Sequence, residues 1–110
     1  MQRGELCWTN FPPPTGLRPA LLLMRDSAYS YRASVTVAPV TRRIRDIASE
    51  VKIGPEEGLD QPSVVNLDDI ITLSKARIRN KIGFLSEAKM QLVEEAIRYC
   101  LALPPYRARF

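Results

Sequence analysis

Residues 16–26, GLRPALLLMRD, contain the most apolar run of the chain, and the rest of the fold is predicted around them. Residues 20–24 are continuously apolar rather than alternating, which is typical of a central strand covered on both faces. Pro19 lacks the amide proton that a central strand needs, so we expect it to begin this strand and to hold Arg18 extended at its mouth. Arg18 is then either an ordinary solvated cation or a phosphate ligand, because its planar fork of donors fits a phosphate.

Alternating apolar and polar residues predict further strands on both sides of this run. The segments with this pattern are 4–10, 34–40, 50–53 and 63–73. The last of them is read as one long strand or as two short strands with a bend at Asp68 and Asp69. Alternation places Asn66 and Asp68 on one face of it. Between the first two strands, residues 11–16, FPPPTG, form a loop, because consecutive prolines exclude regular structure.

After residue 74 the apolar period changes to that of a helix. Ser74 is expected to cap a short helical turn that Gly83 ends, and Ser86 to cap one long helix over residues 87–101. Apolar side chains at spacings of three and four predict the buried face of this helix; they are Met90, Val93, Ile97, Cys100 and Leu101. We therefore predict a mostly β domain over residues 1–103 and a frayed tail over residues 104–110. The domain is either a small, strongly bent antiparallel barrel or a pair of sheets, with a helix packed across it.

Composition favours an anionic partner and excludes several classes of chemistry. The net charge is +4, and the first fifty residues hold seven arginines against four carboxylates, so a polyanion would meet this half of the chain. The chain contains no histidine, which removes the usual general base and the commonest zinc ligand. Cys7 and Cys100 lack metal-binding spacing and are expected to be free thiols. We therefore expect no metal and no cofactor.

The start of the chain gives no signal for export or membrane insertion. No secretory apolar segment follows Met1, and the longest apolar run is far shorter than the ~20 residues of a membrane span. We therefore expect a cytoplasmic protein with no membrane partner.

Four segments, in this order, resemble the MazF/PemK family of toxin endoribonucleases: RGELCW, PPPTGLRPALLL, TVAPVTRRIRDIASEV, and the run from SVVNLDDIITL to the last helix. The resemblance covers nearly the whole chain. It implies an SH3-like barrel of the CcdB/MazF type with a C-terminal helix, and the toxin component of a type II toxin–antitoxin system. It further implies a homodimer that cleaves single-stranded RNA without a metal and is held in check by a cognate antitoxin protein.

The same resemblance implies the catalytic residues. The family's arginine after the first loop falls on Arg18, and the threonine that ends the third strand falls on Thr41. Where one branch of the family carries Arg-x-Asp, this chain has Asn66, Leu67 and Asp68, so only the carboxylate is present. Arg18 would stabilise charge on the phosphate and Thr41 would orient an oxygen or relay a proton. The proton of the 2′-hydroxyl would go to Asp68 if its carboxylate reaches that group, and otherwise to water. Alternatively, Asp68 is a strand-end carboxylate that pairs with Arg77 or Lys75.

Basic residues next to Thr41 predict where RNA would bind. They would contact phosphates, which adds affinity without sequence information. The predicted RNA contacts are Thr15, Arg42, Arg43, Arg45, Asn66 and Asp69. Trp8 either stacks on a base or packs in the core or a dimer contact. Relatives have a longer, glycine-rich and acidic first loop where this chain has FPPPTG, so the alternative is a non-catalytic, CcdB-like protein that binds a protein target, its antitoxin or nucleic acid.

Overall fold

The computed structural model describes residues 1–105, so most of the tail predicted over residues 104–110 lies outside the described part of the chain. The strands are β1 (Glu5–Phe11), β2 (Gly16–Leu22), β3 (Ser34–Thr41), β4 (Glu50–Ile53), β5 (Ser63–Asn66), β6 (Ile71–Ser74) and β7 (Ile78–Phe84). The helix is α1 (Glu87–Leu101), and four 3₁₀ turns connect strands: η1 (Asp26–Ala28), η2 (Pro55–Glu57), η3 (Leu67–Asp69) and η4 (Lys75–Arg77).

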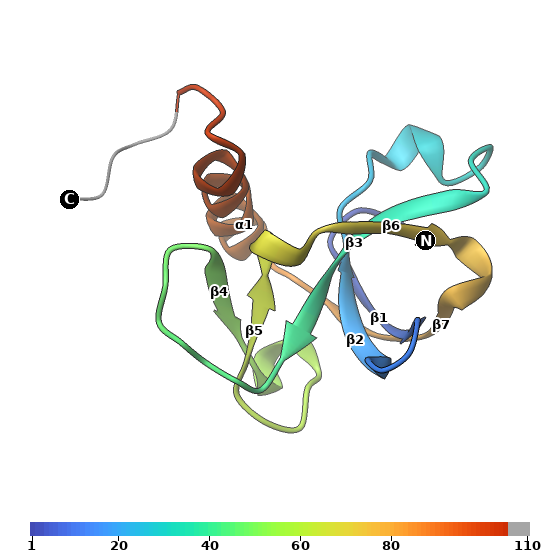
Figure 1. Cartoon of the computed structure of the whole chain (residues 1–110), viewed down its shortest axis with the longest axis horizontal. Helices are drawn as coiled ribbons and strands as arrows, with labels where there is room; N and C mark the ends of the chain where they lie inside the picture. Colours follow the sequence, from blue (N-terminus) through green and yellow to red (C-terminus); the bar gives the residue numbers. More distant parts are fainter. Residues whose placement is uncertain (106–110) are drawn as a thin grey trace.

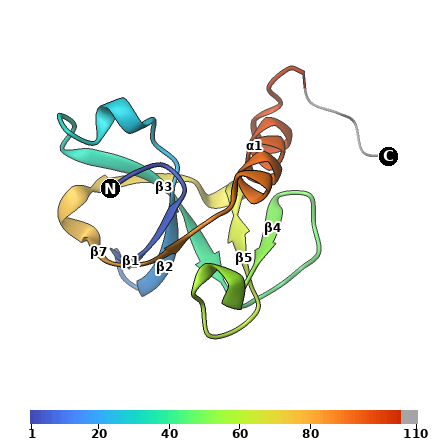
Figure 2. The same cartoon turned by 180° about the vertical axis from the view of Figure 1, so that it is seen from behind.

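One curled antiparallel sheet forms the body of the molecule (Figure 1). Its strand order is β4-β5-β3-β2-β1-β7, and β6 pairs with the first half of β3. β3 changes neighbours along its length, pairing with β6 over Ser34–Val37, with β2 over Val37–Pro39 and with β5 over its last two residues. Seen from behind, β3 joins the β7-β1-β2 side of the sheet to the β5-β4 side (Figure 2). The predicted small bent barrel is confirmed.

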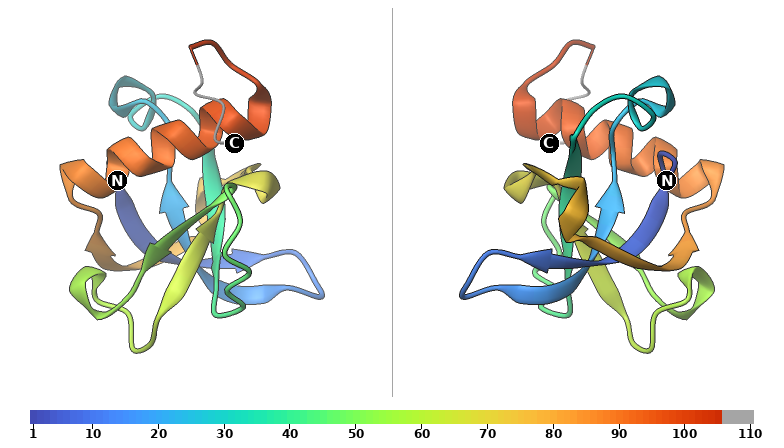
Figure 3. Two further views of the ribbon diagram at one scale, coloured as in Figure 1. Left: turned by 90° about the vertical axis from the view of Figure 1, so that its left-hand side faces the viewer. Right: turned by 90° about the vertical axis from the view of Figure 1, so that its right-hand side faces the viewer.

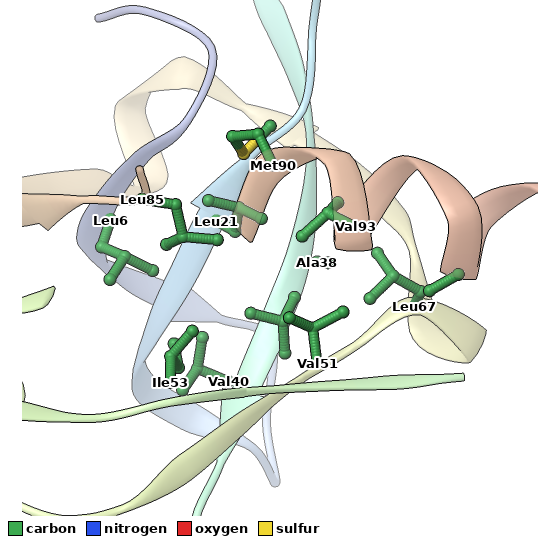
Figure 4. Close-up of a cluster of buried hydrophobic side chains, with 12 residues drawn as sticks. Leu6, Leu21, Ala38, Val40, Val51, Ile53, Leu67, Leu85, Met90 and Val93 are labelled. Atoms are coloured by element: carbon green, nitrogen blue, oxygen red, sulfur yellow. The ribbon is translucent and has the colours of Figure 1, made fainter. Parts of the chain in front are cut away.

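The apolar run of β2 is buried on both faces, as predicted. Leu21 faces one core and its neighbours Ala20 and Leu22 face the other, and all three are fully buried. The first core lies under α1 (Figure 4), and it comprises Leu6, Leu21, Ala38, Val40, Val51, Ile53, Val65, Leu67, Leu85, Met90, Val93 and Ala96. The second lies on the side of η1 and β6, and it comprises Cys7, Phe11, Ala20, Leu22, Tyr29, Val35, Val37 and Leu73.

Helix α1 has the predicted bounds and lies across the strands (Figure 3). The Ser86 hydroxyl caps it by accepting the Lys89 N–H at 3.2 Å. Met90 and Val93 are buried, as predicted, but Leu101 on the final residue of the helix is 58% exposed. Within residues 1–105, no helix has the length and apolarity to cross a membrane.

The start of β2 and the segment after Ser74 differ from the prediction. β2 begins at Gly16 rather than at Pro19, because over this stretch β2 pairs with β1 alone and its other edge needs no donor. The helical turn after Ser74 is present, with the Ser74 hydroxyl accepting the Ala76 N–H at 3.3 Å. It ends at Arg77, however, and the missed strand β7 follows and pairs with β1.

The segment over residues 63–73 forms two strands separated by η3, so the prediction that Asn66 and Asp68 share a strand face is wrong. The Asn66 side chain interrupts the strand because its oxygen accepts the Asp68 N–H at 3.0 Å. Its nitrogen donates to the Asp69 carboxylate at 2.9 Å. Asn66 and Asp69 therefore point to one place, and Asp68 turns away from them.

Candidate active site

Two adjoining hollows share Arg18 and Thr41 in their walls, and together they form what we call the groove. The first, the aromatic hollow, has a volume of about 470 Å³; it is lined by Trp8, Leu17, Arg18, Pro19, Val40, Thr41, Arg42, Gly58, Leu59, Asp60, Gln61, Ser63 and Ile82. The second, the charged hollow, measures about 360 Å³; it is lined by Arg18, Pro39, Thr41, Arg43, Arg45, Glu50, Asn66 and Asp69. The groove thus brings together the two residues predicted to act on the phosphate.

Arg18 reaches the groove because β2 extends past its partner β3. The last β2–β3 pair is Ala20 with Pro39, whereas Arg18 pairs only with Thr9 of β1. The Arg18 side chain is exposed. A guanidinium at this place can offer two parallel N–H groups to a phosphate.

Thr41 enters the groove from the last position of β3 and is half-buried. Its hydroxyl oxygen accepts the backbone N–H of Arg43 at 3.2 Å, which turns the chain at the end of the strand. The hydroxyl keeps its proton for an acceptor in the groove. Thr41 can therefore orient a phosphate oxygen while its own rotamer is held by the following turn.

The charged hollow combines cations with two carboxylates. The Glu50 carboxylate accepts the backbone N–H of Arg45 at 2.9 Å, and Asp69 accepts from Asn66. Sequence reasoning missed Glu50, which opens β4 and whose Cα pairs with that of Asn66 on β5. Its place directly after the arginine-rich loop was the signal that could have indicated it. The predicted contacts Arg43, Arg45, Asn66 and Asp69 all lie in this hollow.

Asp68 lies outside the groove, in neither of the two hollows. Burial first, and then the nearby Asp68 carboxylate, raise the pKa of the Cys100 thiol on α1 to about 12. The position of Asp68 therefore does not support its predicted role as a proton acceptor. The alternative that Asp68 pairs with Lys75 or Arg77 is not supported either. Lys75 donates to the Tyr29 carbonyl, and Arg77 donates to the Asn10 carbonyl.

The remaining predicted residues are divided between the aromatic hollow and the tip of the β1–β2 hairpin. Arg42 and Trp8 line the aromatic hollow, where Trp8 is 39% exposed. The interpretation of Trp8 as a core residue is therefore wrong. Thr15 is exposed at the hairpin tip, where its N–H donates to the Pro12 carbonyl at 3.2 Å, and it lines neither hollow.

The curled sheet, its covering helix and the groove with Arg18 and Thr41 define a small, helix-covered β barrel with a basic groove. Residues 2–101 match the family model described as "PemK-like, MazF-like toxin of type II toxin-antitoxin system". The chain belongs to this family, which confirms the predicted family and the predicted class of enzyme.

Relatives and solved structures agree with this assignment. The chain is 38% identical to Endoribonuclease MazF3 of Mycobacterium tuberculosis over 80 residues, which cover 73% of this chain and 78% of the relative. It is 32% identical to Endoribonuclease MazF of Staphylococcus saprophyticus, over 98% of this chain and 97% of the relative. Among structures, the toxin MazF-mt6 of Mycobacterium tuberculosis is 31% identical, with a TM-score of 0.85 over 90% of this chain and 97% of that one. A mycobacterial endoribonuclease in complex with its cognate antitoxin is 27% identical, with a TM-score of 0.83 over 94% and 97% of the two chains.

Proposed function

We propose that this chain is the toxin of a type II toxin–antitoxin pair and that it cleaves single-stranded RNA in the groove. One observation carries the proposal: Arg18 and Thr41 come from different strands and line both hollows. The similarity to proteins named endoribonucleases supports RNA as the substrate. The alternative of a non-catalytic binding protein is not favoured, because the relatives that match the chain carry the name of an enzyme.

The proposed reaction uses the nucleophile that RNA itself carries. The 2′-oxygen bonds to the neighbouring phosphorus and the bond to the 5′-oxygen breaks, which leaves a 2′,3′-cyclic phosphate and a 5′-hydroxyl. One proton leaves the 2′-hydroxyl and one is delivered to the 5′-oxygen. Arg18 donates to the phosphate oxygens and stabilises the charge that they gain in the transition state. Thr41 donates its hydroxyl proton to a phosphate oxygen and so fixes the orientation of the phosphodiester.

The flanking residues would hold the strand on either side of the cleaved bond. Arg43 and Arg45 in the charged hollow and Arg42 in the aromatic hollow would contact phosphates. Asn66 and Asp69 would offer hydrogen bonds to a base or sugar, although they already bond to each other. A contact with Thr15 requires that the RNA continue along the β1–β2 hairpin.

The same proposal includes the partners and the compartment. The chain would act as a homodimer. It would also bind a cognate antitoxin, since the mycobacterial endoribonuclease of similar structure is found in complex with its own cognate antitoxin. The antitoxin would place an acidic segment over the basic groove and so exclude RNA. The place of action is the cytoplasm, where single-stranded mRNA is available.

A cleavage assay tests the proposal. The purified chain is incubated with a long single-stranded RNA in the presence of EDTA, alongside Arg18→Ala, Arg18→Lys and Thr41→Ala. We expect the parent to cut. The Ala variants should be slower by about 100-fold or more, because each removes a donor to the phosphate. Arg18→Lys should also be impaired, since an ammonium group cannot replace the paired donors of the fork.

Arg79→Ala is the matched control. Arg79 is an exposed arginine on β7 and lines neither hollow, so its loss changes the net charge equally without touching the groove. Cleavage by this variant should stay at the parental rate. A parent that leaves the RNA intact, or Ala variants of Arg18 and Thr41 that cut as fast as the parent with circular dichroism unchanged, would contradict the proposal.

A further inference from the structure

The reaction in the groove needs a proton acceptor, and the obvious sources are missing from this chain. The sequence contains no histidine. The first loop, residues 11–16, leads directly to Leu17 in the wall of the groove, and this loop contains no carboxylate. Asp68 lines neither hollow, and its carboxylate lies near the Cys100 thiol. The carboxylates that line the groove are Asp60 in the aromatic hollow and Glu50 and Asp69 in the charged hollow.

These three carboxylates differ in how they are held. Glu50 is half-buried on the first residue of β4, and one of its oxygens accepts the Arg45 N–H at 2.9 Å, which leaves the other oxygen for substrate. Asp69 is exposed, and one of its carboxylate oxygens accepts from the Asn66 side-chain amide at 2.9 Å rather than from a backbone N–H. Asp60 is exposed and lies in the other hollow, away from Glu50. Only Glu50 among them combines a strand position, partial burial and a backbone donor that fixes its carboxylate.

We propose that Glu50 is the general base of the cleavage reaction, and this inference rests on the proposed function. Its free carboxylate oxygen takes the proton of the 2′-hydroxyl as the 2′-oxygen bonds to phosphorus. Arg18 and Thr41 hold the phosphodiester in the same hollow. The 5′-oxygen leaves with a proton from water, and Glu50 then returns its own proton to water, so no other reactant is needed. Glu50 is therefore a catalytic residue in addition to those predicted from the sequence.

Glu50→Gln tests this role with little change of shape. The glutamine oxygen still accepts the Arg45 N–H but cannot take a proton at neutral pH. Under single-turnover conditions we expect cleavage to slow by about 10²- to 10⁴-fold, the usual contribution of general acid–base catalysis. Binding of a 2′-O-methyl RNA, which cannot be cleaved, should change by no more than about twofold.

Asp60→Asn is the matched control, because it removes one carboxylate charge from the groove at a residue with no assigned role. It should cleave within about threefold of the parent. If Glu50→Gln cleaves at the parental rate, the assignment to Glu50 is overturned and the proposed function stands. A parent that does not cut RNA overturns both.

Chemical rescue separates a base from a structural residue. Glu50→Ala leaves a space that a small carboxylate can enter, so added formate or acetate should restore its cleavage rate at least tenfold. Neither anion should accelerate Thr41→Ala. If both Glu50 variants lose cleavage and neither anion restores it, Glu50 acts by holding the loop at Arg45 and not as a base. That result would overturn the proposal, whether or not the variants remain fully folded.

Discussion

Gly83 on β7 lies directly against the backbone carbonyl of Glu57 in η2, where a Cβ added to Gly83 would stand 2.1 Å from that oxygen. The constraint is one of space, because two backbone segments cross with no room for a side chain. We expect Gly83→Ala to lower the free energy of unfolding by about 2–3 kcal/mol or more, since backbone must move to admit the methyl group. Urea denaturation followed by circular dichroism measures this change.

Gly54→Ala serves as the control for the loss of glycine as such. A Cβ on Gly54 would have its first neighbour, the Pro62 Cα, at 3.6 Å, an ordinary contact distance. The expected cost is below about 1 kcal/mol. Equal unfolding midpoints for the two variants would show that β7 and η2 can separate freely.

Gly83 also shows why one strand could not be predicted from the sequence. Read locally, a glycine after charged residues indicates the end of a helical turn. The stretch over Ile78–Phe84 has no alternating pattern, because its side chains are exposed or only half-buried throughout. It forms a strand because its backbone pairs with the edge of β1, and because Gly83 has no side chain to collide with the backbone of η2. Both causes lie far away in the sequence. The apolar run of β2 and the bounds of α1, by contrast, depend on local pattern and were predicted correctly.

The site divides in the same way. The family resemblance predicted that Arg18 and Thr41 act together, and β2 and β3 are neighbouring strands that bring them into one groove. Alternation failed at Asp68 because Asn66 is a capping residue, and its side chain replaces the strand with a 3₁₀ turn. An asparagine followed by two aspartates was the available signal for that turn. Glu50 follows the arginine-rich loop, but that signal alone does not place it in the groove, because its position there depends on the pairing of β4 with β5.

Cys100 reports on the orientation of Asp68. Burial first, and then the Asp68 carboxylate, raise the pKa of the Cys100 thiol from 9.0 to about 12. At pH 8.5 we expect native Cys100 to react with iodoacetamide at least tenfold more slowly than a free thiol, because little thiolate is present. Asp68→Asn should speed this reaction several-fold by removing the nearby negative charge, and RNA cleavage should be unchanged. Peptide mapping by mass spectrometry separates Cys100 from Cys7.

Asp69→Asn is the control for this experiment, since Asp69 faces the charged hollow and should leave the reactivity of Cys100 unchanged. The sign of the pH effect follows from the same pKa. The folded state keeps the thiol proton more tightly than the unfolded state, so the contribution of Cys100 to stability is lost as pH rises from about 9 towards 12. Abolished cleavage in Asp68→Asn with unchanged alkylation would place Asp68 in the groove instead.

The arginines of the charged hollow should appear in the salt dependence of RNA binding. Arg43 and Arg45 line that hollow, and each phosphate contact releases a counterion from the RNA. Arg43→Ala and Arg45→Ala should each reduce the slope of log K against log salt concentration by about 0.7, the value for one contact to a single strand. Fluorescence anisotropy with a labelled 2′-O-methyl RNA between 50 and about 200 mM salt measures the slope. Arg79→Ala, outside the groove, should keep the parental slope, and parallel lines for all variants would remove these arginines from the RNA path.

Trp8 should stack on a base of the bound strand. It is the single tryptophan of the chain, it is 39% exposed, and it lines the aromatic hollow beside Arg18. Its fluorescence should therefore be quenched when 2′-O-methyl RNA binds. Trp8→Ala should weaken binding by about 1–3 kcal/mol, the range for loss of one stacked base, while Trp8→Phe keeps most of the affinity.

Tyr31→Ala is the control, because Tyr31 is an aromatic side chain that is 65% exposed and lines neither hollow. If the fluorescence is not quenched and the Kd of Trp8→Ala is unchanged, Trp8 does not bind RNA. The remaining interpretation is then a contact between protomers.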